Sequence, residues 1–194
     1  DRGFIADFGF WDETLVIWYD QGLPQWVNPT NTNEFFGMDN YWGTTDIAVD
    51  LAPTFEEKVL EDQGEYELFQ QADGVRVLRK KFMGSIPQHQ GHLLTDRESW
   101  NQHYKPRLDP TNPVRYPADW DERVKVWADP NRDYPIVLAG GSLYGKLRDW
   151  MGLENLSLVV YDDPAWFEEM VTTLADCSIA TLTRALESGG KFDA

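Results

Sequence analysis

The stretch that most constrains the fold is an apolar run that breaks at paired glycines and continues as an amphipathic helix. Residues 136–139 (Ile-Val-Leu-Ala) show no polar alternation, which is typical of a strand that is covered on both faces. Gly140 and Gly141 permit backbone angles that a Cβ would forbid, and Ser142 can cap the N-terminus of the next helix. The pattern predicts a buried parallel strand that passes into a helix, as in an α/β fold.

The helix predicted after Ser142 carries an apolar face at positions i, i+4, i+7 and i+8, which are Leu143, Leu147, Trp150 and Met151. Gly152 stands where a left-handed C-cap belongs. Ligands of α/β folds bind where the strands end. We therefore expect Ser142 and Tyr144 to bind substrate and Arg148 to be catalytic.

Each of these assignments has a structural alternative. Arg148 lies off the apolar face, and we predict that it clamps an anion or balances charge in a transition state. The alternative is a surface salt bridge to Asp149 or Asp12. Tyr144 lies one turn before Arg148 and would share its pocket, unless its hydroxyl only satisfies a loop carbonyl.

A second group of candidates lies near the N-terminus, where residues 4–8 predict a short strand. Asp7 would orient a polar substrate or act as a base, or would instead cap the following turn. Phe8, Phe10 and Trp11 predict an aromatic wall over a flat ligand such as a corrin, with ordinary packing as the alternative.

Local signals predict the other elements. They are a helix that Asp12 caps and that Gly22 and Pro24 end, a long loop over 25–53 with a short helix near 34–38, an antiparallel hairpin excursion over about 64–82, a capping box at 95–98 that opens a short helix through Tyr104, a helix over 119–128 and a long helix that begins at Pro164 and is stopped by Gly189. Only residues 191–194 follow the last helix, where a parallel strand would begin. We therefore expect residues 1–194 to be the N-terminal portion of a single larger domain.

The composition of the chain excludes some classes of binding partner. The formal charge of −16 argues against nucleic acid, since phosphate binding needs a basic surface. No apolar stretch is long enough to span a membrane, and no N-terminal leader pattern is present.

The single Cys177 excludes an internal disulfide and fits a reducing compartment, so we expect a cytoplasmic protein. Cys177 itself is predicted to act as a small hydrophobe. His89, His92 and His103 match no common zinc spacing, and we predict no metal ligands.

Six blocks, in this order along the chain, resemble a poorly characterised branch of the uroporphyrinogen decarboxylase superfamily, which also includes cobamide-dependent methyltransferases. They lie at Phe8–Thr14, Phe55–Leu60, Gly84–Gln88, Asp96–Trp100, Arg107–Pro110 and Leu147–Asn155. The resemblance implies a (β/α)8 barrel of which this chain is the N-terminal half, with the hairpin as an excursion.

The resemblance also bears on the substrate. In the decarboxylase, an arginine after the first strand and an aspartate farther along contact the porphyrinogen. The comparable segments here, 6–10 and 28–33, contain no arginine and no acid respectively, and a catalytic-site tyrosine aligns with Arg148. Losing such a clamp on a carboxylate removes a contact worth about 1.5 to 3 kcal/mol. True uroporphyrinogen decarboxylation is therefore disfavoured.

The function expected from the resemblance is methyl transfer that depends on zinc and a corrinoid, by a methyltransferase or demethylase. Both cofactors would use residues absent from this chain. The alternatives are a lyase of unknown substrate and a non-catalytic barrel remnant, while abundant tryptophan beside acids prompts carbohydrate chemistry as a further class. Expected partners are a small-molecule substrate, a corrinoid protein and a second copy of the chain, because half a barrel exposes two strand edges.

Overall fold

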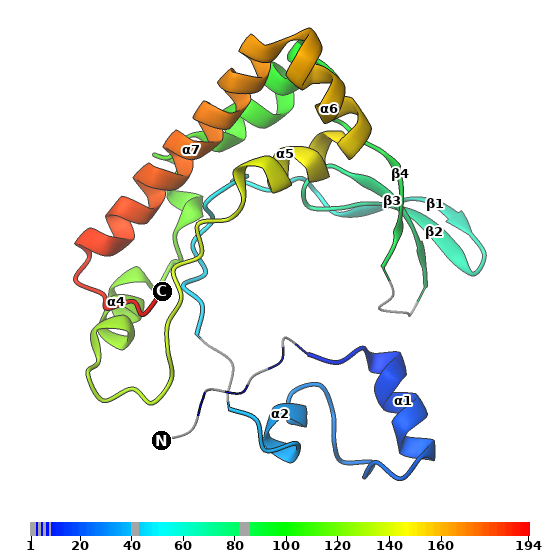
Figure 1. Ribbon diagram of the computed structural model, residues 1–194, viewed down its shortest axis with the longest axis vertical. Coiled ribbons are helices and arrows are strands. Elements are labelled where there is room, and N and C mark those ends of the chain that lie inside the picture. The colour runs from blue at the N-terminus through cyan, green and yellow to red at the C-terminus, as the bar shows by residue number, and fades with distance from the viewer. Residues whose placement is uncertain (1–2, 4, 6, 8, 40–42, 82–85) are drawn as a thin grey trace.

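The computed structural model describes residues 3, 5, 7, 9–39, 43–81 and 86–194, and within them it shows an α+β arrangement (Figure 1). The α-helices are α1 (Asp12–Asp20), α2 (Thr32–Phe35), α3 (Arg97–Ser99), α4 (Trp120–Ala128), α5 (Leu143–Met151), α6 (Leu153–Asp162) and α7 (Pro164–Glu187). The strands are β1 (Lys58–Gln63), β2 (Tyr66–Gln70), β3 (Arg76–Lys80) and β4 (Gln88–Gly91). A π-helical turn (Trp100–Tyr104) and a 3-10 turn (Lys105–Leu108) continue α3, and a second 3-10 turn covers Pro113–Arg115.

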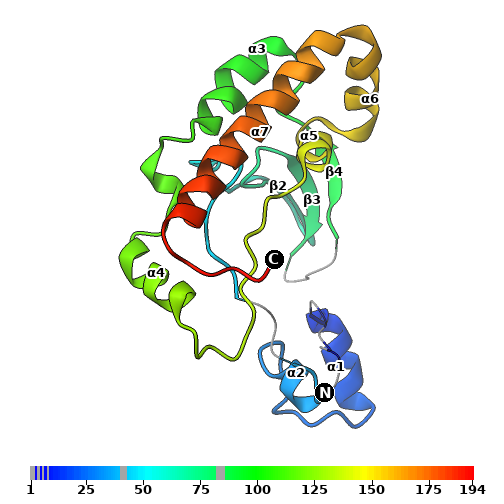
Figure 2. The same cartoon turned by 60° about the vertical axis from the view of Figure 1, so that its left-hand side comes forward.

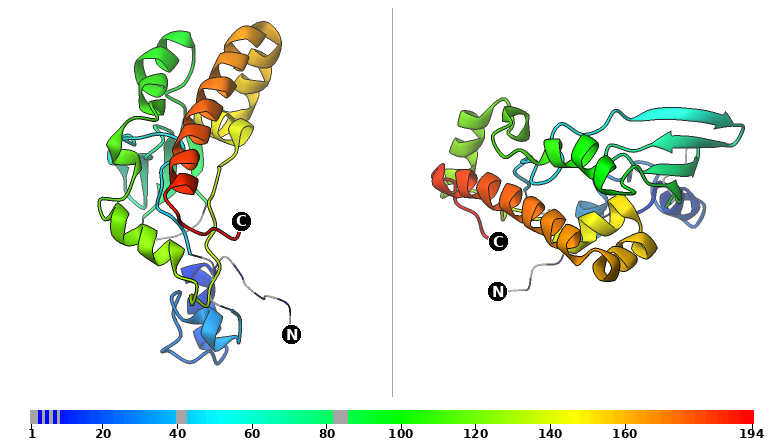
Figure 3. Two further views of the ribbon diagram at one scale, coloured as in Figure 1. Left: turned by 90° about the vertical axis from the view of Figure 1, so that its left-hand side faces the viewer. Right: turned by 90° about the horizontal axis from the view of Figure 1, so that it is seen from above.

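The four strands form one sheet in which every neighbouring pair is antiparallel, in the order β1-β2-β3-β4. The predicted hairpin is confirmed as β2 and β3, with Phe69 opposite Val77. These two residues and Val75 form a small buried cluster. The sheet extends to one side of the helices (Figure 3), and β1, at its edge, is exposed along its whole length.

The predicted half-barrel of parallel strands is wrong. The apolar run that predicted a barrel strand forms a single isolated parallel bridge, between Ile136 and Gly43. Ile136 is buried, but Val137 and Leu138 are only half-buried and residue 139 is exposed, so this run is not covered on both faces. The sheet that does form is the antiparallel one, which the prediction had treated as an excursion.

The main hydrophobic core lies between the three C-terminal helices and the turns that follow α3, and α7 runs alongside those turns (Figure 2). Its buried members are Leu51, Phe55, Leu94, Trp100, Tyr104, Leu108, Leu147, Trp150, Met151, Leu156, Trp166, Met170, Leu174 and Cys177. The predicted apolar face of α5 therefore packs inward at Leu147, Trp150 and Met151. Leu143, at the start of that face, stays exposed.

The end of α5 differs from its prediction. Gly152 has φ 86° and ψ 146°, which is an extended conformation with positive φ rather than a left-handed helical cap. The chain turns there directly into α6, which was not predicted as a separate helix. A Cβ on Gly152 would lie 2.9 Å from Nε2 of His92, the residue that follows β4. The glycine therefore allows His92 to pack against the junction of α5 and α6.

Charged groups tie the start of α7 to the turns after β4. Arg97 donates from Nε and Nη2 to the two carboxylate oxygens of Asp163, at 2.8 and 2.9 Å, and from Nη1 to Glu169 at 3.2 Å. Lys105 donates to the carboxylate of Glu169 at 2.8 Å. The indole N–H of Trp100 donates to the same carboxylate at 3.3 Å. Donation from Arg97 holds the pKa of Asp163 below its ordinary value, and donation from Lys105 does the same for the pKa of Glu169.

We expect Arg97→Gln to weaken the protein more at neutral than at acid pH. A carboxylate with a lowered folded-state pKa adds stability above its unfolded pKa and loses it as pH falls through the folded value. Urea unfolding of both proteins should therefore show a larger difference in midpoint at about pH 7 than at about pH 3. A difference that stays constant over this range would show that Arg97 acts through packing on Trp166, not through the two carboxylates.

The N-terminal helices α1 and α2 lie side by side at one end of the molecule, away from α5 and α7 (Figures 1 and 2). The predicted helix is confirmed as α1, but Asp12, which was predicted as its N-cap, is its first residue, and the N-cap is Trp11. The short helix expected near 34–38 begins earlier, at Thr32. No described helix has both the length and the apolar character needed to cross a bilayer.

Candidate functional site

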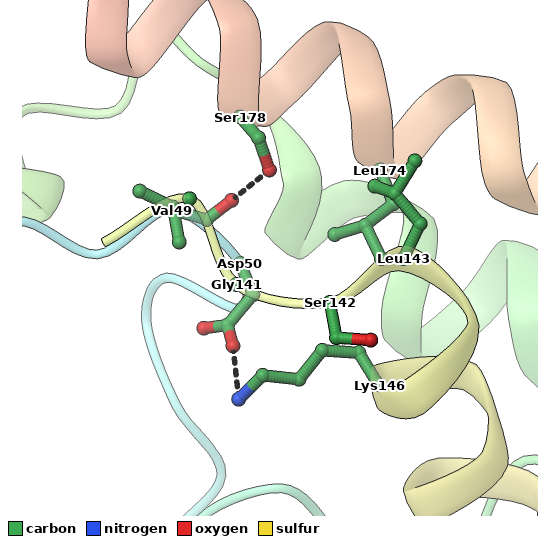
Figure 4. A pocket seen from close by; sticks show the side chains of 9 residues that line it. Val49, Asp50, Gly141, Ser142, Leu143, Lys146, Leu174 and Ser178 are labelled. Atoms are coloured by element: carbon green, nitrogen blue, oxygen red, sulfur yellow. Dashed lines mark hydrogen bonds and ion pairs between the residues drawn. The ribbon is translucent and has the colours of Figure 1, made fainter. Parts of the chain in front are cut away.

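The predicted glycine turn forms a small pocket with the loop before the sheet and with α7 (Figure 4). Its lining includes Gly141, whose φ is 73°, and the carboxylate of Asp50, which pairs with Lys146 at 2.6 Å. On the other side, Ser178 donates to the carbonyl of Val49 at 2.9 Å. The cavity measures about 10 Å³, which is room for one water molecule and not for a substrate.

Ser142 has the local role predicted for it. Its Oγ accepts a hydrogen bond from the Gly145 amide at 3.0 Å, so it is the N-cap of α5. Ser142→Ala removes that acceptor, and we expect the free energy of unfolding to fall by about 1 kcal/mol. Thermal unfolding of this variant, compared with Ser142→Asp, which keeps an acceptor, measures the cap. Equal losses in both variants would contradict the capping role.

The Asp50–Lys146 pair is a feature that the sequence reasoning missed. Gly140, Gly145 and Lys146 have the spacing of a phosphate-binding loop, which is the signal that could have drawn attention to the lysine. The geometry does not support that function, because Lys146 is engaged by Asp50. The position where such loops carry a serine or threonine is Leu147, which is fully buried in the core.

Arg148 and Tyr144 lie on α5 but do not line this pocket. Both are exposed, and Arg148 donates to the carboxylate of the next residue, Asp149, at 2.8 and 3.1 Å. This pair is the surface salt bridge that the sequence left as the alternative. Among the described residues, no contact of Arg148 assigns it a chemical role.

The candidates near the N-terminus likewise show no arrangement that assigns them a chemical role within the described residues. Phe8 lies outside the described residues. Asp7 is half-buried and its carboxylate accepts from the Gly9 amide at 3.2 Å, which is the turn-capping alternative. Trp11 is exposed at the start of α1. Trp11 caps α1, and α1 lies away from α5, so the described members of the two predicted groups do not meet in one site (Figure 1).

Phe10 leads to a site that the sequence did not define. Its ring centroid lies 5.5 Å from that of Trp18 and 5.5 Å from that of Phe36, and these two rings are 6.0 Å apart, edge to face. Phe36 also contacts Phe35, with centroids 5.0 Å apart. Phe10 therefore packs into an aromatic cluster built from α1 and α2.

The exposed side of this cluster forms an open groove of about 370 Å³, which we call the aromatic groove. It is lined by Trp18, Gln21, Gly22, Leu23, Pro24, Phe35 and Phe36. The chain turns back after α1 because Gln21 and Gly22 donate to the carbonyls of Trp18 and Tyr19. Tyr19 in turn donates to the carbonyl of buried Val27 at 2.6 Å, which holds the returning segment against α1.

Potential metal ligands and nucleophiles are dispersed. No group of three or more His, Cys, Asp or Glu side chains that could hold a metal ion occurs in the part of the chain that the structure describes. Burial raises the pKa of the Cys177 thiol, which keeps it protonated and agrees with its place on the inner face of α7.

Comparison of the chain with models of protein families, with curated proteins and with solved structures found no match. The resemblance to the uroporphyrinogen decarboxylase superfamily stays a prediction that depends on the six sequence blocks.

Proposed function

We propose that this protein binds a small organic molecule in the aromatic groove. The observation that carries the proposal is the size and lining of that groove. At about 370 Å³ it falls within the range of small-molecule sites, and its walls are aromatic and aliphatic with one amide side chain, Gln21. The Gly141–Ser142 pocket, at about 10 Å³, is too small for such a ligand.

Exposure of the groove's rings supports a binding role. Phe35 and Phe36 are 37% and 42% exposed, and the neighbouring Trp26 is 62% exposed. Isolated exposed apolar residues are normal on protein surfaces, but a contiguous aromatic surface around a hollow is typical of an interaction site. Trp18 lies on α1 and Phe36 directly follows α2, and both line the groove.

Methyl transfer remains our proposal for the chemistry of this protein, on the basis of the sequence resemblance alone. The residues described here do not fit the zinc that this chemistry would use, since they assemble no ligand set. The aromatic groove is also too small to enclose a corrin. We therefore derive no catalytic step through either cofactor and assign Arg148 and Asp7 none.

The binding proposal is tested with neutral probes. Titration of the ¹⁵N-labelled chain with phenol and with 3,3-dimethylbutan-1-ol should move the Trp18 indole signal and the amide signals of Gly22 and Phe36. Trp18→Ala should abolish these shifts, while Tyr161→Ala, which removes an 85% exposed ring on α6, should preserve them. Shifts spread evenly over the chain, or unchanged in Trp18→Ala, would refute the proposal.

A further inference from the structure

The charge of the N-terminal region is one-sided in a way that bears on the aromatic groove. Residues 3–57 contain no lysine, arginine or histidine, although acids recur through them. Two of these acids adjoin groove residues: Asp20 precedes Gln21, and Glu34 precedes Phe35. Both are exposed, and within the described residues neither forms an ion pair. The segment that builds the groove therefore carries a net negative charge.

The backbone adds to this negative charge. Gln21 and Gly22 of the groove follow directly on the C-terminal end of α1. A helix C-terminus carries partial negative charge, and a basic residue in the last turn usually offsets it. α1 has no basic residue there and ends instead on Asp20. A cation in the aromatic groove would interact favourably with this helix end.

Aromatic faces attract the same kind of ligand. The ring faces of tryptophan and phenylalanine carry negative potential and bind cations, most strongly where water is partly excluded. The aromatic groove presents Trp18, Phe35 and Phe36 together. Its one polar side chain is Gln21, so it offers few acceptors to an ammonium group that needs hydrogen bonds. An alkylated ammonium, which has a positive charge and an apolar surface, makes no such demand.

We propose that the aromatic groove is a site for organic cations of the quaternary ammonium class, held over Trp18 and Phe36 within the negative field of α1 and its flanking acids. This inference rests on the proposed function and specifies its ligand class. It requires that the positive charge, and not only the shape of the ligand, contributes to affinity.

A pair of isosteres isolates the charge. Choline and 3,3-dimethylbutan-1-ol have the same shape, but the positively charged nitrogen of choline is a neutral carbon in the alcohol. We expect the full chain to bind choline about 2- to 30-fold more tightly, as measured by quenching of tryptophan fluorescence and by calorimetry. Added salt should weaken choline binding and leave binding of the neutral probe nearly unchanged.

A matched variant tests the ring. Trp18→Leu keeps an apolar wall but removes the π face, so it should lower the preference for choline while the neutral probe still binds. Tyr161→Leu, on α6, should keep the wild-type preference. If Trp18→Leu does not fold, Phe36→Leu provides the same test.

The outcomes separate the two proposals. Equal affinity for choline and its neutral isostere would overturn the cation site and leave small-molecule binding in place. Failure of both probes to bind would overturn small-molecule binding and the cation site with it. A choline preference that survives both Trp18→Leu and Phe36→Leu would show that the cation binds elsewhere.

Discussion

Replacing Arg115 with methionine is expected to lower the free energy of unfolding by about 3 to 5 kcal/mol. The side chain is 1% exposed, and its guanidinium donates to four backbone carbonyls, those of Asp109 at 2.7 Å, Ala48 at 2.8 Å, and Asp50 and Arg107. Methionine fills a similar volume but donates nothing, so four carbonyl groups lose their bond to a buried side chain.

This effect should reach the Gly141–Ser142 pocket. The segment 48–50 that Arg115 holds also supplies Val49 and Asp50 to that pocket. Hydrogen exchange in Arg115→Met is therefore expected to be faster at Val49 and at the first turn of α5. The Asp50–Lys146 pair would lose its fixed geometry.

The control is Arg123→Met. Arg123 forms ion pairs with Asp46 at 2.7 Å and with Asp119 at 3.1 Å. It lies at the surface, where water competes for these interactions. Urea unfolding should give a midpoint close to wild type for Arg123→Met and a much lower one for Arg115→Met. Similar midpoints for the two variants would show that the buried guanidinium is not the support proposed here.

The features that could be predicted from sequence are those set by neighbours along the chain. The Ser142 cap and the β2–β3 turn at Asp73-Gly74 each depend on residues within a few positions. The strand β1 was missed because it is exposed on both faces, so its sequence shows no alternation of apolar and polar residues. Arg115 lies in a proline-rich connection, where nothing local signals that a charge will be buried.

The barrel and the aromatic groove illustrate the harder problem of partners that are distant in sequence. An apolar run such as 136–139 predicts burial but not which segment lies beside it. Here its backbone bonds go to Gly43, Asp193 and Ala194 rather than to a full strand. Trp18 lies on α1, yet Phe36 is eighteen positions away, in the short helix that was expected near 34–38 within a long loop. The turn at 21–24 brings the two together, and its path depends on backbone hydrogen bonds that side-chain pattern does not show.

A methyl group added at Gly74 is expected to cost about 2 to 5 kcal/mol of stability, from two sources. Gly74 has φ 85°, which strains any residue with a Cβ. In addition, that Cβ would lie 2.9 Å from the Tyr104 hydroxyl and 3.2 Å from the Phe55 ring. The hydroxyl is itself fixed, because it donates to the carbonyl of Asp73 at 3.0 Å.

Gly64 provides a control that separates strain from crowding. It lies in the turn between β1 and β2 with φ 78°, and a Cβ there would meet nothing within 4 Å. Gly64→Ala therefore carries the backbone strain alone, and Gly74→Ala carries strain and contact together. Urea unfolding should show a larger loss of unfolding free energy for Gly74→Ala than for Gly64→Ala. The difference between the two losses measures how closely the β2–β3 turn packs against Phe55 and Tyr104. Equal losses would mean that this turn is not part of the helical core's packing, and that the sheet is joined to the helices only through the chain.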